Sequence, residues 1–349
     1  MTMKRIAKIA LGTISLFTLT LGGMVVQAGG WDNFKLRYFH LTSVFHDQSK
    51  ELDDIKQQQE AKPVAETARI DLNDLFNGGP PKDGIPSLDN PKFDTAQTTP
   101  FDKAETVIGI VMNGEAKAYP YKIMNWHEIV NDSIGGINVS VTYCPLCDTI
   151  AAFTRGNTTF GVSGKLYQSC LVMYDRADDT LYSQPWTLGI VGPGVNESLD
   201  RIPAVKTSLG DWLEKHPQSQ ILSTDTGYNR NYQRYPYGSY STDDRIIFSV
   251  RNQQQRELHP KAIVSYIWES SEKTPKGKLG GASAQFSHQE MQAVGEKTIQ
   301  FNGRKVKARW DSELETVIVE EMEGTRIPSS TAFAFVYPAF FPDATSEST

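Results

Sequence analysis

The feature that most constrains the fold is a run of short apolar segments between Thr106 and Tyr182, each closed by a turn signal. The segments are rich in β-branched and aromatic residues, and the pairs Asn113-Gly114 and Gly135-Gly136 are typical of tight turns between antiparallel strands. A short helix is expected at 121–130, after Pro120. Strands are expected at 106–112, 115–119, 137–143, 149–154, 158–162, 171–174 and 180–182. The pattern predicts an α+β, β-rich fold of antiparallel strands with short helices.

A weak internal repeat is visible in two stretches that share one spacing. Arg201-Ile202-Pro203 and Arg326-Ile327-Pro328 are each followed by an aromatic residue and then by a second proline, at the same distance from the first proline in both cases. We therefore expect a degenerate internal duplication, with a first β-rich unit at 71–255 and a second, cysteine-free β-rich unit at 256–349. A chance match between two tripeptides is the alternative.

The first 28 residues have the pattern of an export signal. Three cations, Lys4, Arg5 and Lys8, precede an uncharged run from Ile9 to Val26, and the small residue Ala28 offers a cleavage site. An uncleaved N-terminal anchor is the alternative, because the run is just long enough to span a bilayer. In either case the remainder is expected to be periplasmic or extracellular. Residues 29–70 are expected to form an N-terminal segment and a polar, Gln-rich linker.

Composition and charge restrict the partners that the chain can have. Lys and Arg total 35 against 41 Asp and Glu, and a net charge of -6 argues against nucleic acid as a partner. A small molecule or a metal ion is expected instead, with a membrane as a partner only if the leader stays uncleaved. Hydrolase and nucleotide-binding functions are disfavoured, because Gly161-Val162-Ser163-Gly164 is too short for a nucleophile elbow and Gly277-Lys278 is followed by leucine. The sequence does not indicate an oligomeric state.

The chain has three cysteines, and two of them form the motif Cys144-Pro145-Leu146-Cys147 at the exit of an expected strand. Such a turn brings two sulfurs onto one metal ion or into one disulfide. His127 and Cys170 are available as a third and a fourth ligand. Soft thiolates with an imidazole favour copper(I), zinc or iron over magnesium or calcium, so we expect copper or zinc as the cofactor.

Two other interpretations of the cysteine motif stay open. In the first, the chain is a thiol-dependent enzyme in which Cys144 is the nucleophile and His127 the base. In the second, it is a binding module, and a Cys144–Cys147 disulfide only braces a loop. Whichever applies, residues from neighbouring strands are expected to line the rim of the site, namely Lys165, Tyr167, Asp175 and Arg176.

Several characteristic stretches occur together in this chain. They are residues 78–86 with Asp89, Asn113-Gly114-Glu115-Ala116, Asn125-Trp126-His127-Glu128-Ile129-Val130-Asn131-Asp132, Thr142-Tyr143-Cys144-Pro145-Leu146-Cys147, Phe160-Gly161-Val162-Ser163-Gly164 and Met173-Tyr174-Asp175-Arg176. With them the chain resembles the bacterial and archaeal family known as domain of unknown function 3179, over about 71–345. The resemblance implies export, one continuous unit and a weak repeat, and it implies His127, Cys144 and Cys147 as the candidate site without an established reaction. The chain differs from the family pattern at Asp148, usually glycine, and at Cys170, usually Asp or Asn.

Overall fold

The computed structural model describes Ile55 and residues 68–253, 257–270 and 281–342. The expected leader at 1–28 and most of the expected linker at 29–70 lie outside the described residues, so both stay predictions. Within the described part of the chain, no helix is long and apolar enough to cross a membrane.

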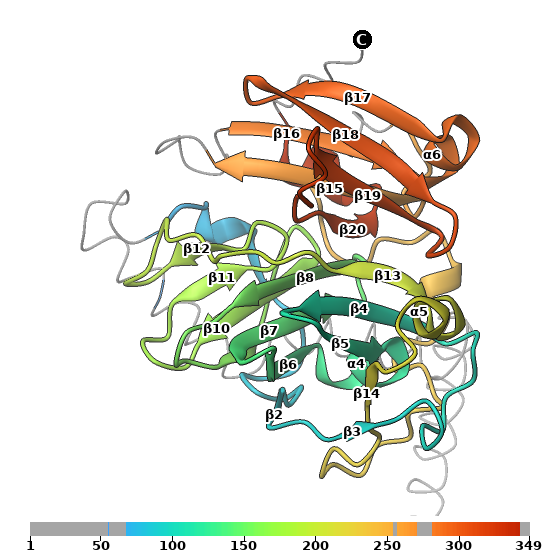
Figure 1. Ribbon diagram of the computed structural model, residues 1–349. Helices are drawn as coiled ribbons and strands as arrows, with labels where there is room; N and C mark the ends of the chain where they lie inside the picture. Colours follow the sequence, from blue (N-terminus) through green and yellow to red (C-terminus); the bar gives the residue numbers. More distant parts are fainter. Residues whose placement is uncertain (1–54, 56–67, 254–256, 271–280, 343–349) are drawn as a thin grey trace, which may run out of the picture.

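Strands dominate the described chain and form five sheets, with few short helices between them (Figure 1). The strand pairs of these sheets are antiparallel except β2–β6 and β14–β5, which confirms the expected β-rich class. Three sheets belong to the part before residue 223. The first has the strand order β1 (Leu75–Asn77), β9 (Phe160–Tyr167), β10 (Cys170–Asp175), β11 (Leu181–Ser183), β12 (Leu188–Val191). The second has the order β2 (Leu88–Asp89), β6 (Ile129–Ile134), β7 (Ile137–Cys144), β8 (Thr149–Thr154). The third has the order β13 (Val205–Ser208), β4 (Thr106–Met112), β5 (Glu115–Pro120), β14 (Gln220–Leu222), β3 (Phe93–Asp94).

The remaining two sheets form the other end of the molecule, coloured orange and red in Figure 1. Their orders are β16 (Gly281–Ser287), β15 (Ile263–Ser270), β20 (Ser330–Phe333); and β17 (Glu296–Phe301), β18 (Arg304–Asp311), β19 (Thr316–Glu321). The helices of the described residues are short α-helices and 3₁₀ turns: α4 (Tyr121–His127), α5 (Leu209–Lys215), α6 (His288–Val294), α7 (Val336–Phe340), η2 (Leu72–Asp74) and η3 (Tyr240–Thr242).

One helix is shorter than expected. The sequence predicts a helix over 121–130, but α4 ends at His127 and Ile129 already begins strand β6. Glu128 lies between them with φ 58° and ψ -30°, a conformation that stops the helix. The β-branched pair Ile129-Val130 then favours a strand.

The order of elements from β4 to β8 recurs from β15 to β19. We call β4, β5, α4, β6, β7 and β8 the first series, and β15, β16, α6, β17, β18 and β19 the second series. Helix α4 begins at Tyr121 and α6 begins at His288, and we call the difference between these two residue numbers the shift. The same shift separates β6 from β17, β7 from β18 and β8 from β19. The strand order β13-β4-β5 likewise matches β20-β15-β16.

The two Arg-Ile-Pro stretches occupy the same place in the two series. The backbone N–H of Ile202 donates to Ala152 in β8 at 2.9 Å, and that of Ile327 donates to Val319 in β19 at 2.8 Å. Ala152 and Val319 are related by the same shift as the two helices. This recurrence supports the expected duplication, whereas the proposed unit boundary near residue 256 stays a prediction.

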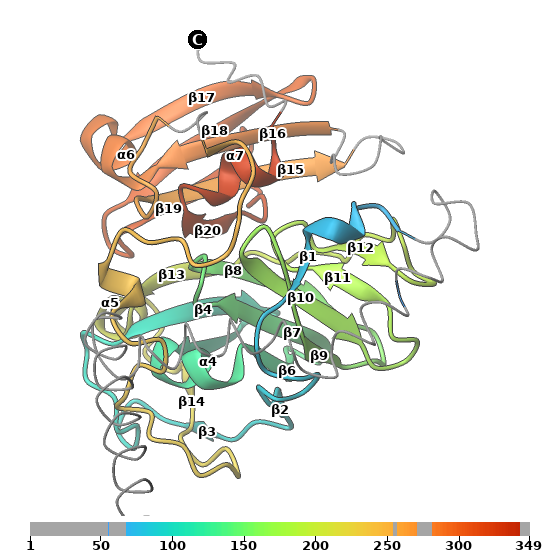
Figure 2. The same cartoon turned by 180° about the vertical axis from the view of Figure 1, so that it is seen from behind.

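Buried side chains link the two ends of the molecule. One core cluster combines side chains of the second series, such as Phe286 and Met291, with Ile327, whereas a larger one combines the cysteines with Tyr266, Phe335 and other residues from β15 onward. Helix α7 lies between the second series and the strands β1 and β8–β12, as Figure 2 shows. The chain after residue 256 therefore completes the core around the cysteines.

Candidate functional site

The cysteine motif forms the turn between β7 and β8. The backbone N–H of Cys147 donates to the carbonyl of Cys144 at 3.3 Å, and Asp148 follows with φ 51°. Asp148 is buried and accepts hydrogen bonds from Tyr143 Oη at 3.1 Å and from Lys206 Nζ. These bonds explain how an Asp is accommodated where the family resemblance leads one to expect glycine.

The three thiols form one buried cluster. Cys170 begins β10, and the Cys147 thiol interacts with the thiols of both Cys144 and Cys170. All three are free thiols, so the Cys144–Cys147 disulfide expected under one interpretation is not formed. Burial raises the pKa of Cys144 and Cys147 well above the ordinary thiol value and that of Cys170 to about 11. The cluster is therefore protonated at neutral pH.

Glu128 is a buried carboxyl group whose charge acts on Cys144. Its carboxylate interacts electrostatically with the Cys144 thiol, and Oε1 accepts a hydrogen bond from Tyr237 Oη at 2.7 Å. Burial raises the pKa of Glu128 to about 7, against the opposing effect of the Tyr237 hydrogen bond. Sequence reasoning missed Glu128, although it directly follows His127 in the family motif. It is a group that exchanges a proton near neutral pH beside a thiol.

A segment rich in tyrosine covers the thiols and Glu128. We call residues 226–252 the tyrosine segment; it contains five tyrosines but no strand. Tyr240 Oη donates to the carbonyl of Leu146 at 2.8 Å, within the cysteine turn itself. From the chain that follows the second series, the backbone N–H of Phe333 donates to the carbonyl of Cys147 at 2.8 Å. The cysteine turn is thus held by two segments that lie far beyond it in the sequence.

His127 does not join the thiols in the way that the sequence suggests. Its Nδ1 bonds to the carbonyl of Pro86 at 2.8 Å and its Nε2 to Tyr232 Oη at 2.7 Å, so both ring nitrogens have other partners. Burial lowers the pKa of His127 to about 4, which keeps the ring neutral. Of the two neighbouring residues, Glu128 is the one whose charge acts on Cys144.

The expected metal site is not formed by these side chains. Across residues 68–253, 257–270 and 281–342, no group of three or more His, Cys, Asp and Glu side chains could hold a metal ion. The grouping of His127 with Cys144, Cys147 and Cys170 as ligands stays a prediction, and the hydrogen bonds of both His127 ring nitrogens to other groups do not support it. Binding of copper or zinc stays a prediction.

The four residues expected at the rim do not share one. Tyr167 is buried and packs against Trp186 and Phe340 at ring distances of 5.4 and 5.6 Å. Asp175 and Arg176 follow Cys170 by five and six residues along the strand direction, which places them roughly 16 to 20 Å away. Lys165 is buried in β9 opposite Val172. Tyr167 lies directly opposite Cys170 in the β9–β10 hairpin, so of the four residues it is the one whose strand position pairs with a cysteine.

Arg176 instead fastens the Gly- and Pro-rich loop at 78–90. Its Nη2 donates to Asp83 and to Ser87 Oγ, both at 2.9 Å, and its Nη1 pairs with Asp89 at 3.2 Å. Asn131 adds a hydrogen bond to Asp89 at 2.6 Å. Residues of three separate family stretches therefore meet at this loop.

Comparison with known proteins adds one family. A family model described as "Protein of unknown function (DUF3179)" matches residues 82–344. The chain belongs to the DUF3179 family. The DUF3179 match spans both series and ends beyond α7, in agreement with one continuous family unit. Neither a curated protein nor a solved structure matches the chain.

Proposed function

We propose that this DUF3179 protein is an exported thiol redox protein, in which Cys144 and Cys147 are reversibly oxidised to a disulfide by a small disulfide compound. The observation that carries the proposal is the interaction of the Cys147 thiol with two other buried free thiols, together with a buried carboxyl group, Glu128, whose charge acts on Cys144. The leader pattern at 1–28 supports the exported location.

The turn geometry suits a disulfide between Cys144 and Cys147. The hydrogen bond from Cys147 to Cys144 closes a four-residue turn, in which the first and last Cα atoms are less than about 7 Å apart. Disulfides need Cα separations of roughly 4.4 to 6.8 Å. Oxidation therefore requires a rotation of the two side chains and no rearrangement of the strands.

The reaction balances as two thiol–disulfide exchanges. In the first, the Cys144 sulfur attacks one sulfur of the compound RSSR, a Cys144–SR bond forms and RS⁻ leaves. In the second, the Cys147 sulfur attacks the Cys144 sulfur, the protein disulfide forms and a second RS⁻ leaves. The two thiol protons go to the two thiolates as they leave, so the protein loses two electrons and two protons and RSSR becomes two RSH.

Glu128 gives this chemistry a proton carrier. A buried thiol with a raised pKa is a weak nucleophile, because the thiolate is the reactive form. A carboxylate with a pKa of about 7 beside Cys144 can take the thiol proton and pass it to the leaving RS⁻. Tyr237 holds that carboxylate in place through its hydrogen bond.

The test is oxidation of the purified full chain with glutathione disulfide, followed by thiol counting and intact mass. We expect the wild type to lose two thiols and to carry no glutathione at the end. The Cys147→Ser variant should keep glutathione on Cys144, because the second exchange is blocked. Cys170→Ser is the matched control and should form the same disulfide as the wild type.

Two results would contradict the proposal. One is a folded wild-type protein that keeps all three thiols in glutathione disulfide while the urea-unfolded chain reacts, since the thiols would then be buried packing groups. The other is one equivalent of copper or zinc per chain that is lost in Cys147→Ser, which would favour the metal interpretation. Glu128→Gln should slow the first exchange about tenfold or more and remove the inflection near pH 7 from its rate profile.

A further inference from the structure

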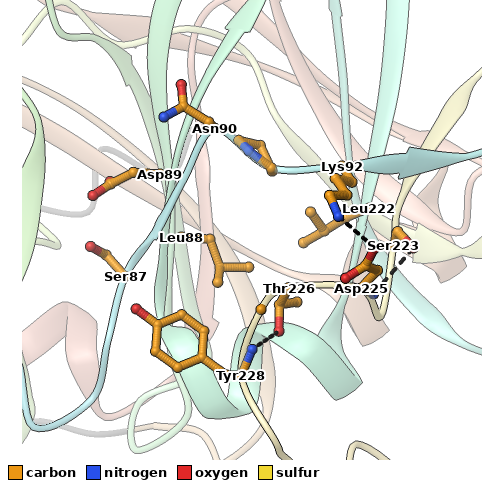
Figure 3. Close-up of a pocket in the computed structure, with 12 residues that line it drawn as sticks. Ser87, Leu88, Asp89, Asn90, Lys92, Leu222, Ser223, Asp225, Thr226 and Tyr228 are labelled. Atoms are coloured by element: carbon orange, nitrogen blue, oxygen red, sulfur yellow. Dashed lines mark hydrogen bonds and ion pairs between the residues drawn. The ribbon is translucent and has the colours of Figure 1, made fainter.

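A pocket on the other side of His127 has no role in the thiol chemistry. Two segments line it, 87–92 and 222–228, and its volume is about 370 Å³. Figure 3 shows the two segments facing each other, with Lys92 and Asp225 at one end and Tyr228 at the other. The volume falls in the lower part of the range of small-molecule sites.

His127 connects the two walls of this pocket. Its Nδ1 bonds to Pro86, which precedes the first wall, and its Nε2 bonds to Tyr232. The Tyr232 hydroxyl is also hydrogen-bonded to Thr226 Oγ1 at 2.5 Å, within the second wall. The Tyr228 ring lies 5.3 Å from the His127 ring. A fully buried neutral imidazole therefore fixes both sides.

Arg176 and a backbone bond hold the walls from outside. Arg176 binds Ser87 and Asp89 in the first wall, as described above. At the far end the backbone N–H of Ser223 donates to the carbonyl of Lys92 at 2.9 Å. The pocket is thus preformed, which lowers the entropic cost of binding a ligand.

The lining is polar but nearly balanced in charge. Lys92 pairs with Asp225 at 2.6 Å and Asp89 pairs with Arg176, so its charged groups already have partners of opposite sign. Hydroxyl, amide and carboxylate groups line the pocket together with the apolar side chains of Leu88 and Leu222. Such a lining favours a neutral ligand with many hydroxyl groups, since each hydroxyl both donates and accepts hydrogen bonds.

Tyr228 provides an exposed aromatic surface in the lining of the pocket. It is 45% exposed, the only tyrosine among the large exposed apolar side chains of the described residues. An exposed ring next to planar polar side chains is the arrangement that binds a sugar ring, whose C–H face packs on the aromatic face while its hydroxyls bond to the polar groups. We propose that this pocket binds one ring of a neutral carbohydrate. The inference is independent of the proposed redox function.

The experiment measures binding of neutral trisaccharides of glucose, mannose, xylose and N-acetylglucosamine to the full chain, by saturation-transfer NMR and calorimetry. We expect at least one to bind with a dissociation constant at or below about 1 mM. Tyr228→Ala should weaken binding at least about tenfold, and Tyr228→Phe should keep it within about threefold because the ring remains. Asp225→Ala, at the opposite end, should weaken it about tenfold.

Val294→Ala is the matched control, because Val294 is exposed and lies at the position of the second series that corresponds to His127. It should bind like the wild type. The proposal is overturned if none of the four sugars binds at about 10 mM, or if Tyr228→Ala and Asp225→Ala bind as tightly as the control. It is also overturned if glucose 1-phosphate binds more than about tenfold tighter than glucose, because the site would then select an anion.

Discussion

The first and second series share a backbone but not a chemistry. Tyr143 donates to Glu128 through its backbone N–H at 2.8 Å, and Trp310 donates to Gly295 in the same way at 2.7 Å, at positions related by the shift that relates α4 to α6. The side chains differ under the same shift: Cys144 corresponds to Asp311, Cys147 to Leu314, His127 to Val294 and Glu128 to Gly295. The second series thus forms this backbone without the cysteines, the histidine or the glutamate.

The difference at Glu128 is the most informative. Both residues end a helix with positive φ, 58° for Glu128 and 84° for Gly295. Glycine adopts this conformation without steric cost, whereas a residue with a Cβ atom is strained by about 1 to 3 kcal/mol. The first series therefore tolerates strain at Glu128, whose charge acts on Cys144, which supports a role for that carboxyl group beyond folding.

The largest expected effect concerns a buried ion pair that the first series has and the second lacks at the corresponding positions. Lys117 contacts Asp132 at 3.0 Å, and Tyr119 Oη donates to Asp132 at 2.7 Å. The corresponding residues of the second series are Ala284, Ile299 and Phe286. Lys117→Ala should lower the free energy of unfolding by about 3 to 5 kcal/mol, because it leaves a buried carboxylate without its cation. Urea unfolding measures the loss.

The triple change Lys117→Ala, Tyr119→Phe and Asp132→Ile installs the second-series residues and should recover most of that stability. Lys307→Ala, which removes a less buried pair with Glu320 at 3.0 Å, is the matched control and should cost less than about 1 kcal/mol. A triple variant as unstable as Lys117→Ala would contradict the correspondence between the two series.

The next largest effect is a pH dependence of the free energy of unfolding, which Glu128 confers. Its pKa is about 7 in the folded chain against 4.5 for the ordinary value, so the folded protein holds the proton more tightly. Stability from this group is fully present below pH 4.5 and is lost as pH rises to about 7, by roughly 3 kcal/mol in total. Unfolding of wild type and Glu128→Gln between pH 5 and 8 should show this loss in the wild type alone.

Two other buried groups act in the opposite direction. Burial lowers the pKa values of His127 and His288 to about 4. The contribution of these two histidines to the free energy of unfolding is therefore lost as pH falls below about 6.5. Both histidines remain in Glu128→Gln, and the difference between the two proteins isolates the glutamate. Glu315→Gln, an exposed change in the second series, should follow the wild-type curve. Parallel curves for wild type and Glu128→Gln would exclude a raised pKa.

A smaller effect is expected for His127→Val, which installs the second-series residue. The change removes hydrogen bonds to Pro86 and Tyr232 and should cost about 2 kcal/mol. It should also speed proteolysis within the tyrosine segment, since Tyr232 loses its partner. The reciprocal Val294→His lies on an exposed surface and should change the melting temperature little. Equal effects of the two changes would contradict the role given to His127.

The smallest effect is expected for Gly295→Glu, which recreates the strain of Glu128 without its tyrosine partner. It should cost about 1 kcal/mol. Glu128→Gly relieves backbone strain, which stabilises the fold, but it also loses the hydrogen bond from Tyr237, which destabilises it. These two opposing effects on the free energy of unfolding should nearly cancel. Urea unfolding at pH 7 measures the free energy of unfolding of Gly295→Glu and of Glu128→Gly. A stability gain above about 1 kcal/mol in Glu128→Gly would show that strain dominates.

The sequence predicts the strands better than the site. The hairpin at Asn113-Gly114 and the turn at Gly135-Gly136 are local, because glycine and asparagine adopt positive φ readily, and both turns form as expected. The cysteine turn at the exit of β7 is likewise local. The clustering of Cys170 with Cys147 needs the β9–β10 hairpin to pack beside that turn, which a strand pattern alone does not specify.

The contacts of His127 and Glu128 depend on distant partners. His127 binds a carbonyl 41 residues before it and a hydroxyl 105 residues after it, and no local pattern indicates either. Glu128 was overlooked because a positive φ at a glutamate leaves no mark in the sequence. The tyrosine segment has no periodicity, so its position over the thiols depends wholly on tertiary contacts such as that of Tyr240 with Leu146.

The hydrogen bond from Phe333 to Cys147 has a consequence for the order of events during synthesis. Phe333 leaves the ribosome long after Cys147, and Tyr240 lies midway between them in the sequence. Until both have arrived, the cysteine turn lacks two of its covering contacts and its thiols face solvent. The thiols of a nascent chain are thus more accessible to oxidants and metal ions than those of the finished protein, and they can react before the last third of the chain has folded over them.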